Sequence, residues 1–101
     1  MTSKKSFTVH AKVWVYPGMA AWRFVNVDKA QSVYIKEKYG ARVRGFGSIR
    51  VSVTLGTSRW DTSIFPDKQS GTYLLPLKAK IRAAEQIDDG DAVTFKLDIR
   101  V

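Results

Sequence analysis

The sequence contains no cysteine and only one histidine, His10. It can therefore form no disulfide, no thiolate nucleophile and no cysteine-based zinc site. A metal site built only from carboxylates would need clustered acidic side chains. Asp88, Asp89 and Asp91 do cluster, but around Gly90, where aspartates are explained by a turn. We therefore expect neither a metal site nor a cofactor.

Long apolar runs are also missing. No stretch approaches the roughly 20 residues that a helix needs to cross a bilayer, and no membrane partner is expected. The lysines near the N-terminus are not followed by the apolar segment of a signal peptide. With no cysteines for extracellular disulfides, we expect a cytoplasmic protein.

The signatures of catalysis are weak as well. A serine nucleophile needs a base within hydrogen-bond reach, and only His10, in the middle of an expected strand, could serve. No G-x-S-x-G elbow occurs. The Gly45–Phe46–Gly47 run is too short for a phosphate loop and lacks the Lys-Ser/Thr pair that should follow it. The sequence thus predicts no catalytic residue and disfavours an enzyme.

Positive charge, by contrast, is abundant. Lysine and arginine number 17 against 9 acidic residues, for a net charge of +8. Such an excess attracts nucleic acid, phosphorylated metabolites or an acidic protein through its long-range field. The alternative is that these charged side chains only lie in water at the surface and keep the protein soluble. They form no block along the chain, so the sequence does not reveal a single patch.

The hydrophobic pattern predicts one domain. A chain of 101 residues, 45% of them hydrophobic, has room for one core and can fill it without cross-links. We expect a flexible N-terminus over residues 1–6 and a single β-barrel domain over residues 7–101. Alternating apolar and polar residues, bounded by turn residues, predict strands. The expected strands cover residues 7–16, 22–27, 41–55, 59–65, 73–75 and 93–99.

Two helices are expected between these strands. The first covers residues 28–39, with Asp28 as N-cap and Ala30, Val33 and Tyr34 on its buried face. The second starts at Pro76, a residue suited to the first helical position, and ends near residue 86. Its expected buried stripe consists of Leu77, Ile81 and Ala84.

The predicted fold is mainly β: a small closed or pseudo-closed barrel of the double-split type, with about six strands and two short capping helices. Closure would remove exposed strand edges. The residues expected to be buried together in its core are Ile49, Val51, Val53, Leu55, Ile81, Val93, Phe95 and Leu97.

Residues across nearly the whole chain resemble one uncharacterised bacterial family. The resemblance is carried by Gly18, Trp22, Phe24, Val25, the GFGSIRVSVTLG run, Trp60, Ser63, Ile64, Phe65, Pro66, the YLLPLK run, Arg82, Gly90 and Asp91. The family is known only as a domain of unknown function, a small β-barrel sometimes placed ahead of a YdeI/OmpD-associated segment. The resemblance implies a fold and no activity.

A second, local resemblance concerns LPLKAKIRAAEQIDDGDAVTF. It is similar to the strand–Pro–helix–Gly-Asp–strand signature of AbrB/MazE-type double-split barrels, which are DNA-binding dimers with swapped hairpins. Here, in a departure from that pattern, we expect one chain to hold two such halves. The resemblance implies an AbrB-like ancestry, and with it a nucleic-acid-binding regulatory role.

Two sets of basic residues are candidate contacts. Arg50, Arg59, Trp60 and Lys68 are expected on the outside, where an aromatic beside arginines can stack on bases or contact a partner. Trp60 could instead close one end of the barrel.

The second set lies at the helix expected from Pro76. Leu75 would be its N-cap but has no side-chain acceptor, which leaves N–H groups for an anion beside Lys78, Lys80 and Arg82. Alternatively, Glu85 pairs with Arg82, and a strand or water satisfies these N–H groups.

Taken together, these patterns indicate a small basic binding or interaction module, a monomer or weak homodimer. The alternatives are the nucleic-acid-binding regulatory protein and, third, a protein that binds an anion or a phosphate ligand.

Overall fold

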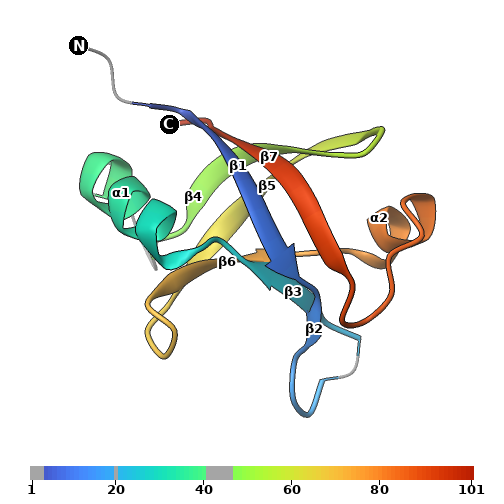
Figure 1. Ribbon diagram of the computed structural model, residues 1–101. Coiled ribbons are helices and arrows are strands. Elements are labelled where there is room, and N and C mark those ends of the chain that lie inside the picture. Colours follow the sequence, from blue (N-terminus) through green and yellow to red (C-terminus); the bar gives the residue numbers. More distant parts are fainter. Residues whose placement is uncertain (1–3, 20, 41–46) are drawn as a thin grey trace.

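The computed structural model describes residues 4–19, 21–40 and 47–101. Within these residues the chain is mainly β, with seven strands and two helices (Figure 1). The strands are β1 (Ser6–Lys12), β2 (Trp14–Val15), β3 (Arg23–Asn26), β4 (Ile49–Leu55), β5 (Ser58–Asp67), β6 (Thr72–Pro76) and β7 (Ala92–Ile99). The helices are α1 (Lys29–Tyr39) and α2 (Ala79–Ala84). In the described part of the chain, neither helix is long and apolar enough to span a bilayer.

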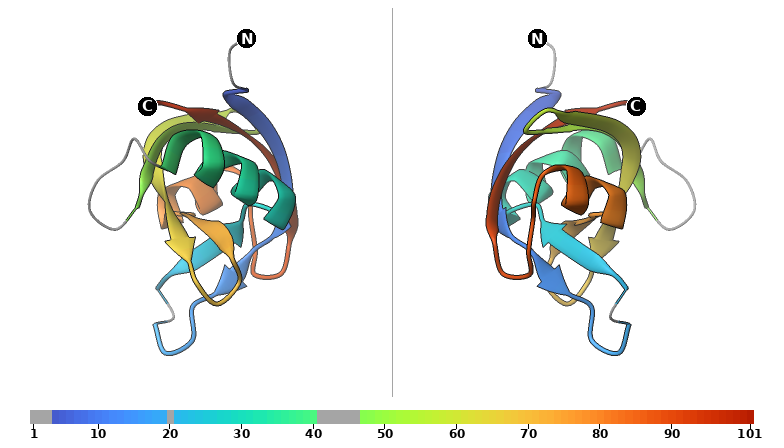
Figure 2. Two further views of the ribbon diagram at one scale, coloured as in Figure 1. Left: turned by 90° about the vertical axis from the view of Figure 1, so that its left-hand side faces the viewer. Right: turned by 90° about the vertical axis from the view of Figure 1, so that its right-hand side faces the viewer.

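All seven strands form one antiparallel sheet in the order β1-β7-β4-β5-β6-β3-β2. The sheet curls around the core as a half-barrel (Figures 1 and 2). Its two outermost strands, β1 and β2, are consecutive in the chain and separated only by Val13. The Val13 N–H donates to the Asp91 carbonyl at 2.9 Å, and its own carbonyl accepts from the Gly90 N–H at 2.8 Å. The chain therefore stops pairing on the β7 side at Val13 and pairs with β3 from Trp14 onward.

The prediction of a mainly β chain with two short helices is confirmed, but the closed or pseudo-closed barrel of about six strands is corrected on two counts. Within the described residues the hydrogen-bonded ladders stop at β1 and β2, so no ladder closes the sheet. The extra strand arises because the strand expected over residues 7–16 divides at Val13. Val13 is buried like Phe7 and Val9 before it, so the alternation of apolar and polar residues continues through the division and gives no sign of it.

The core forms largely as the alternation predicts. All four inward residues of β4 are buried, as are Phe95 and Leu97 of β7. The register sets Val53 opposite Leu97, which places the two inward faces side by side. Val93 packs partly buried against this cluster. Ile81 is only half-buried, so its predicted place in the core is wrong.

Helix α1 covers one open side of the curled sheet (Figure 2). Asp28 caps it as predicted, accepting the Gln31 N–H at 2.9 Å. Its buried residues are Ser32, Ile35 and Tyr39, so the predicted face is wrong for Ala30 and Val33, which are exposed, while Tyr34 packs partly buried against the core. The reason is Ser32, whose hydroxyl donates to the Val27 carbonyl at 2.9 Å and accepts the Tyr73 N–H at 3.1 Å. A polar residue that bridges a helix and a strand is invisible to a hydrophobic pattern.

Helix α2 differs most from its prediction. Pro76 is the last residue of β6 and lies opposite Phe24, and the next residue, Leu77, still donates its N–H to the Arg23 carbonyl at 2.9 Å. The helix begins only at Ala79, and Lys78 is its N-cap, without a side-chain cap bond. Leu75 is therefore a buried strand residue and not a cap. None of the residues of α2 is buried, so the predicted stripe is wrong for Ile81 and Ala84, whereas Leu77 is buried but precedes the helix.

Candidate functional site

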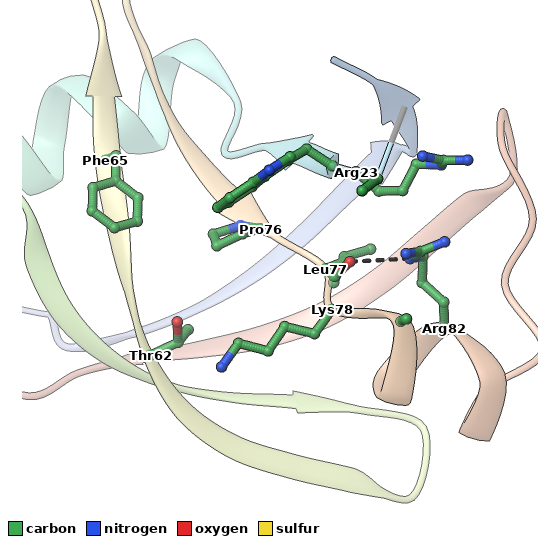
Figure 3. A pocket seen from close by; sticks show the side chains of 10 residues that line it. Arg23, Thr62, Phe65, Pro76, Leu77, Lys78 and Arg82 are labelled. Carbon is green, nitrogen blue, oxygen red and sulfur yellow. Dashed lines mark hydrogen bonds between the residues drawn. The ribbon is translucent and has the colours of Figure 1, made fainter. Parts of the chain in front are cut away.

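The candidate site lies where β5 and β6 separate. β5 pairs with β6 only from Phe65 to Asp67, and its earlier residues pair with β4. β6 meanwhile pairs with β3 up to Pro76. A pocket of about 450 Å³ opens between them, bounded on its other side by the start of α2 (Figure 3).

Two large apolar side chains line this pocket and remain about half exposed to solvent. Trp22 is 49% exposed and Phe65 is 43% exposed. Pro76 and the buried Leu77 add further apolar surface to the lining. Single exposed apolar residues are ordinary, but two aromatic rings beside one concave surface are typical of a binding site.

The charged residues that line the pocket are all cations. They are Arg23, Lys78 and Arg82, and among the described lining residues none is acidic. The Arg23 guanidinium is ion-paired with Asp89, with Nε and Oδ1 2.5 Å apart. Arg82 Nε donates to the Leu77 carbonyl at 3.1 Å, which holds its guanidinium at the pocket. Figure 3 shows the Lys78 side chain extended along the pocket, with its ammonium group toward Thr62.

The structure brings two of the three predicted anion-binding residues together. Lys78 and Arg82 line the same pocket, and Lys80 does not. Glu85 does not take Arg82 as a hydrogen-bond partner in the described chain. Its carboxylate instead accepts from the hydroxyls of Ser58 at 2.6 Å and Thr57 at 3.2 Å. The Ser58 hydrogen bond is the main reason why the pKa of Glu85 lies below its usual value. Anion binding by these cations remains a prediction.

A row of aromatic side chains leads away from the pocket. The Trp22 ring stacks on Phe24 with centroids 5.9 Å apart, Phe24 contacts Trp14 at 5.3 Å, and Trp14 stacks on Tyr16 at 6.2 Å. Trp14 Nε1 donates to Asn26 Oδ1 at 2.6 Å, which orients the indole. This row was not predicted from the sequence. Its signal in the sequence was the aromatic residues at alternating positions in and next to β2 and β3.

The structure does not bring the four residues of the other predicted set, the nucleic-acid or partner contacts, to one surface. Arg50 of β4 and Arg59 of β5 are both exposed, on adjacent strands. Trp60 is half-buried and packs against the core, so its predicted outward position is wrong. In a strand, successive side chains point to opposite faces, so Arg59 and Trp60 do not share one. Lys68 lies in the turn after β5 and lines a different pocket.

Arg50 and Arg59 belong to a cluster that includes a residue missed by the sequence analysis, Arg100. The three arginines act together on the Asp61 carboxylate. A hydrogen bond from the Ser52 hydroxyl lowers the pKa of Asp61 most, and the positive charges of Arg100, Arg50 and Arg59 lower it further. Asp61 stays ionised and offsets one of the three charges, so the cluster remains cationic.

The described residues offer few groups that could bind a metal ion. In the part of the chain that the structure describes, no three histidine, cysteine or acidic residues group closely enough to hold one. The candidate site is therefore best described by its aromatic rings and its cations.

Comparison with known proteins shows which family the chain belongs to. A family model described as a domain of unknown function (DUF1905) matches residues 10–97. The match extends from β1 into β7 and includes every residue that lines the pocket. No curated protein matches the chain. The resemblance to AbrB/MazE-type barrels is not confirmed by these comparisons.

Proposed function

The chain belongs to the DUF1905 family, a family of unknown function, and on that premise we propose that it is a binding module. Its ligand would occupy the pocket between Trp22 and Phe65 and would combine an apolar or aromatic body with an anionic group. The observation that carries this proposal is the pairing of two half-exposed aromatic rings with a lining whose charged residues are cations.

The energetics favour a ligand with both parts. A Trp or Phe side chain can bury about 150–250 Å², so covering the exposed parts of two rings removes on the order of 200 Å² from water. At about 25 cal/mol per Å², this supplies on the order of 5 kcal/mol. Association consumes much of that gain. An anionic group beside Lys78 and Arg82 would then add charge-assisted hydrogen bonds and fix the orientation of the ligand.

The dye 8-anilinonaphthalene-1-sulfonate is a direct probe, because it carries aromatic rings and a sulfonate. We expect the folded protein to bind it with a rise in dye fluorescence. Trp22→Ala and Lys78→Ala should each weaken binding about tenfold, the loss expected for one good contact. Lys80→Ala is the matched control: Lys80 is an exposed lysine near the start of α2 that does not line the pocket. Equal affinities of the Lys78→Ala and Lys80→Ala variants would refute the proposal.

Nucleic-acid binding is the second candidate, supported by the arginine cluster on β4 and β5. Three arginines around one carboxylate leave a net positive surface that can contact phosphates. We expect a mobility shift with DNA or RNA at low salt. Arg50→Ala or Arg59→Ala should weaken binding and reduce the salt slope by about one. Lys38→Ala, on the exposed side of α1, should leave the slope unchanged. If wild-type protein gives no shift at about 50 mM salt, this candidate is discarded.

A further inference from the structure

A second pocket, of about 370 Å³, lies between α1 and the turn that connects β5 to β6. It shares no lining residue with the pocket beside α2. The two helices lie on opposite sides of the molecule in Figure 1, α1 on the left and α2 on the right. A ligand here would therefore be independent of the function proposed above.

Three lysines from two elements line this second pocket. Lys29 and Lys36 are seven residues apart on α1 and so lie on the same side of the helix, two turns apart. Lys68 comes from the β5–β6 turn. Within the described residues, none of the three lysines forms an ion pair. The pocket thus gathers three positive charges, none of which is paired with a carboxylate of the described chain.

Lys29 is placed against the backbone of that turn. Gly71 has a φ of +69°, and a Cβ at this position would collide with the Lys29 ammonium group. The ammonium group therefore lies in the space that a side chain at residue 71 would occupy. Among the described residues it has no hydrogen-bond acceptor. Lys29 also lies in the first turn of α1, where the helix dipole disfavours a cation, and the neighbouring Asp28 carboxylate is used to cap the helix.

The only acidic residue that lines this pocket, among those described, is Asp67. One of its oxygens, Oδ2, accepts from the Ser70 hydroxyl at 2.7 Å and from the Ser70 N–H at 3.3 Å, both within the turn. The carboxylate is therefore used to hold the turn. Beside the lysines, Val33 is 44% exposed and offers an apolar contact.

We propose that this pocket binds the phosphoryl group of a small phosphorylated molecule. Three ammonium groups exceed the single carboxylate by two charges, which matches a phosphate dianion. Lysine binds phosphate as a compact point charge with three donors. The pocket has room for more than one phosphoryl group, and Val33 can contact the rest of the ligand.

Thermal unfolding with inorganic phosphate and with pyrophosphate tests this proposal. Because a ligand that binds only the folded state raises the melting temperature, both anions should raise it above a sodium chloride control of equal ionic strength. Pyrophosphate should act at lower concentration. Lys36→Ala should weaken the apparent affinity about tenfold. Lys38→Ala is the matched control, since Lys38 also lies in the last turn of α1 but outside the pocket.

A further variant tests Lys29, whose ammonium group lies against Gly71. Lys29→Met keeps the apolar stem and removes the charge, so it should lose most of the phosphate response and leave the phosphate-free melting temperature nearly unchanged. A response reproduced by sodium chloride, or retained in both Lys36→Ala and Lys29→Met, would overturn the proposal. So would a response lost in Lys78→Ala and kept in Lys36→Ala, because it would place the anion beside α2.

Discussion

Replacing Phe95 with alanine should lower the free energy of unfolding by about 3–5 kcal/mol, the usual cost of removing a buried aromatic ring. Phe95 is 1% exposed, on the inward face of β7. Strand β7 lies between β1 and β4, and Phe95 is opposite the buried Val9. The cavity would therefore open where two strand pairings meet, and the surrounding strands could collapse into it only in part.

Denaturant unfolding measures this effect. Domains of this size are stable by only about 5–15 kcal/mol, so the variant should unfold at a much lower denaturant concentration. Lys96→Ala is the control, because Lys96 is the next residue of the same strand and is exposed. It should change stability by no more than about 0.5 kcal/mol. A Phe95→Ala midpoint equal to the wild-type midpoint would show that the inward face of β7 has been assigned wrongly.

Gly56→Ala should also destabilise the protein, for two reasons that add. Gly56 begins the turn between β4 and β5 with a φ of +60°, a conformation that disfavours alanine. A Cβ at this position would also collide with the Glu85 carboxylate. That carboxylate would have to leave the hydroxyls of Ser58 and Thr57, which tie the end of α2 to the turn.

Gly90→Ala separates the two contributions. Gly90 has a φ of +84°, but a Cβ there would meet nothing within 4 Å. This control should show only the backbone strain, about 1–2 kcal/mol, whereas Gly56→Ala should lower the melting temperature clearly further. Combining Gly56→Ala with Glu85→Ala should cost less than the sum of the two single changes, because both lose the same hydrogen bonds. Equal melting temperatures for Gly56→Ala and Gly90→Ala would rule out the contact with Glu85.

The sequence predicts the inward faces of the sheet well, since a period of two along β4 and β7 depends only on neighbouring residues. It fails where the outcome depends on distant partners. Pro76 suits either the first turn of a helix or the end of a strand, and pairing with Phe24 decides for the strand. Val13 fits an unbroken strand, but the pairing partner changes after it, from the residues before β7 to β3, which Trp14 joins.

The candidate site was predictable only in part for the same reason. Lys78 and Arg82 attract notice as cations close together in the sequence. Trp22 and Phe65 are 43 positions apart, and they come to one pocket only because β5 separates from β6 beside β3. Trp60 could have been placed better from the sequence alone, since a strand that exposes Arg59 turns the next residue inward.

The pairing of β1 with β7 also sets the order in which the fold can form during synthesis. Ser6 lies opposite Asp98, so the first strand must wait for residues made some 92 positions later. The β4–β5 hairpin joins neighbours and can form within microseconds, whereas contacts between distant residues slow folding toward milliseconds or seconds. Until β7 emerges from the ribosome, β1 stays without its partner, and its apolar residues remain open to chaperones and to other nascent chains.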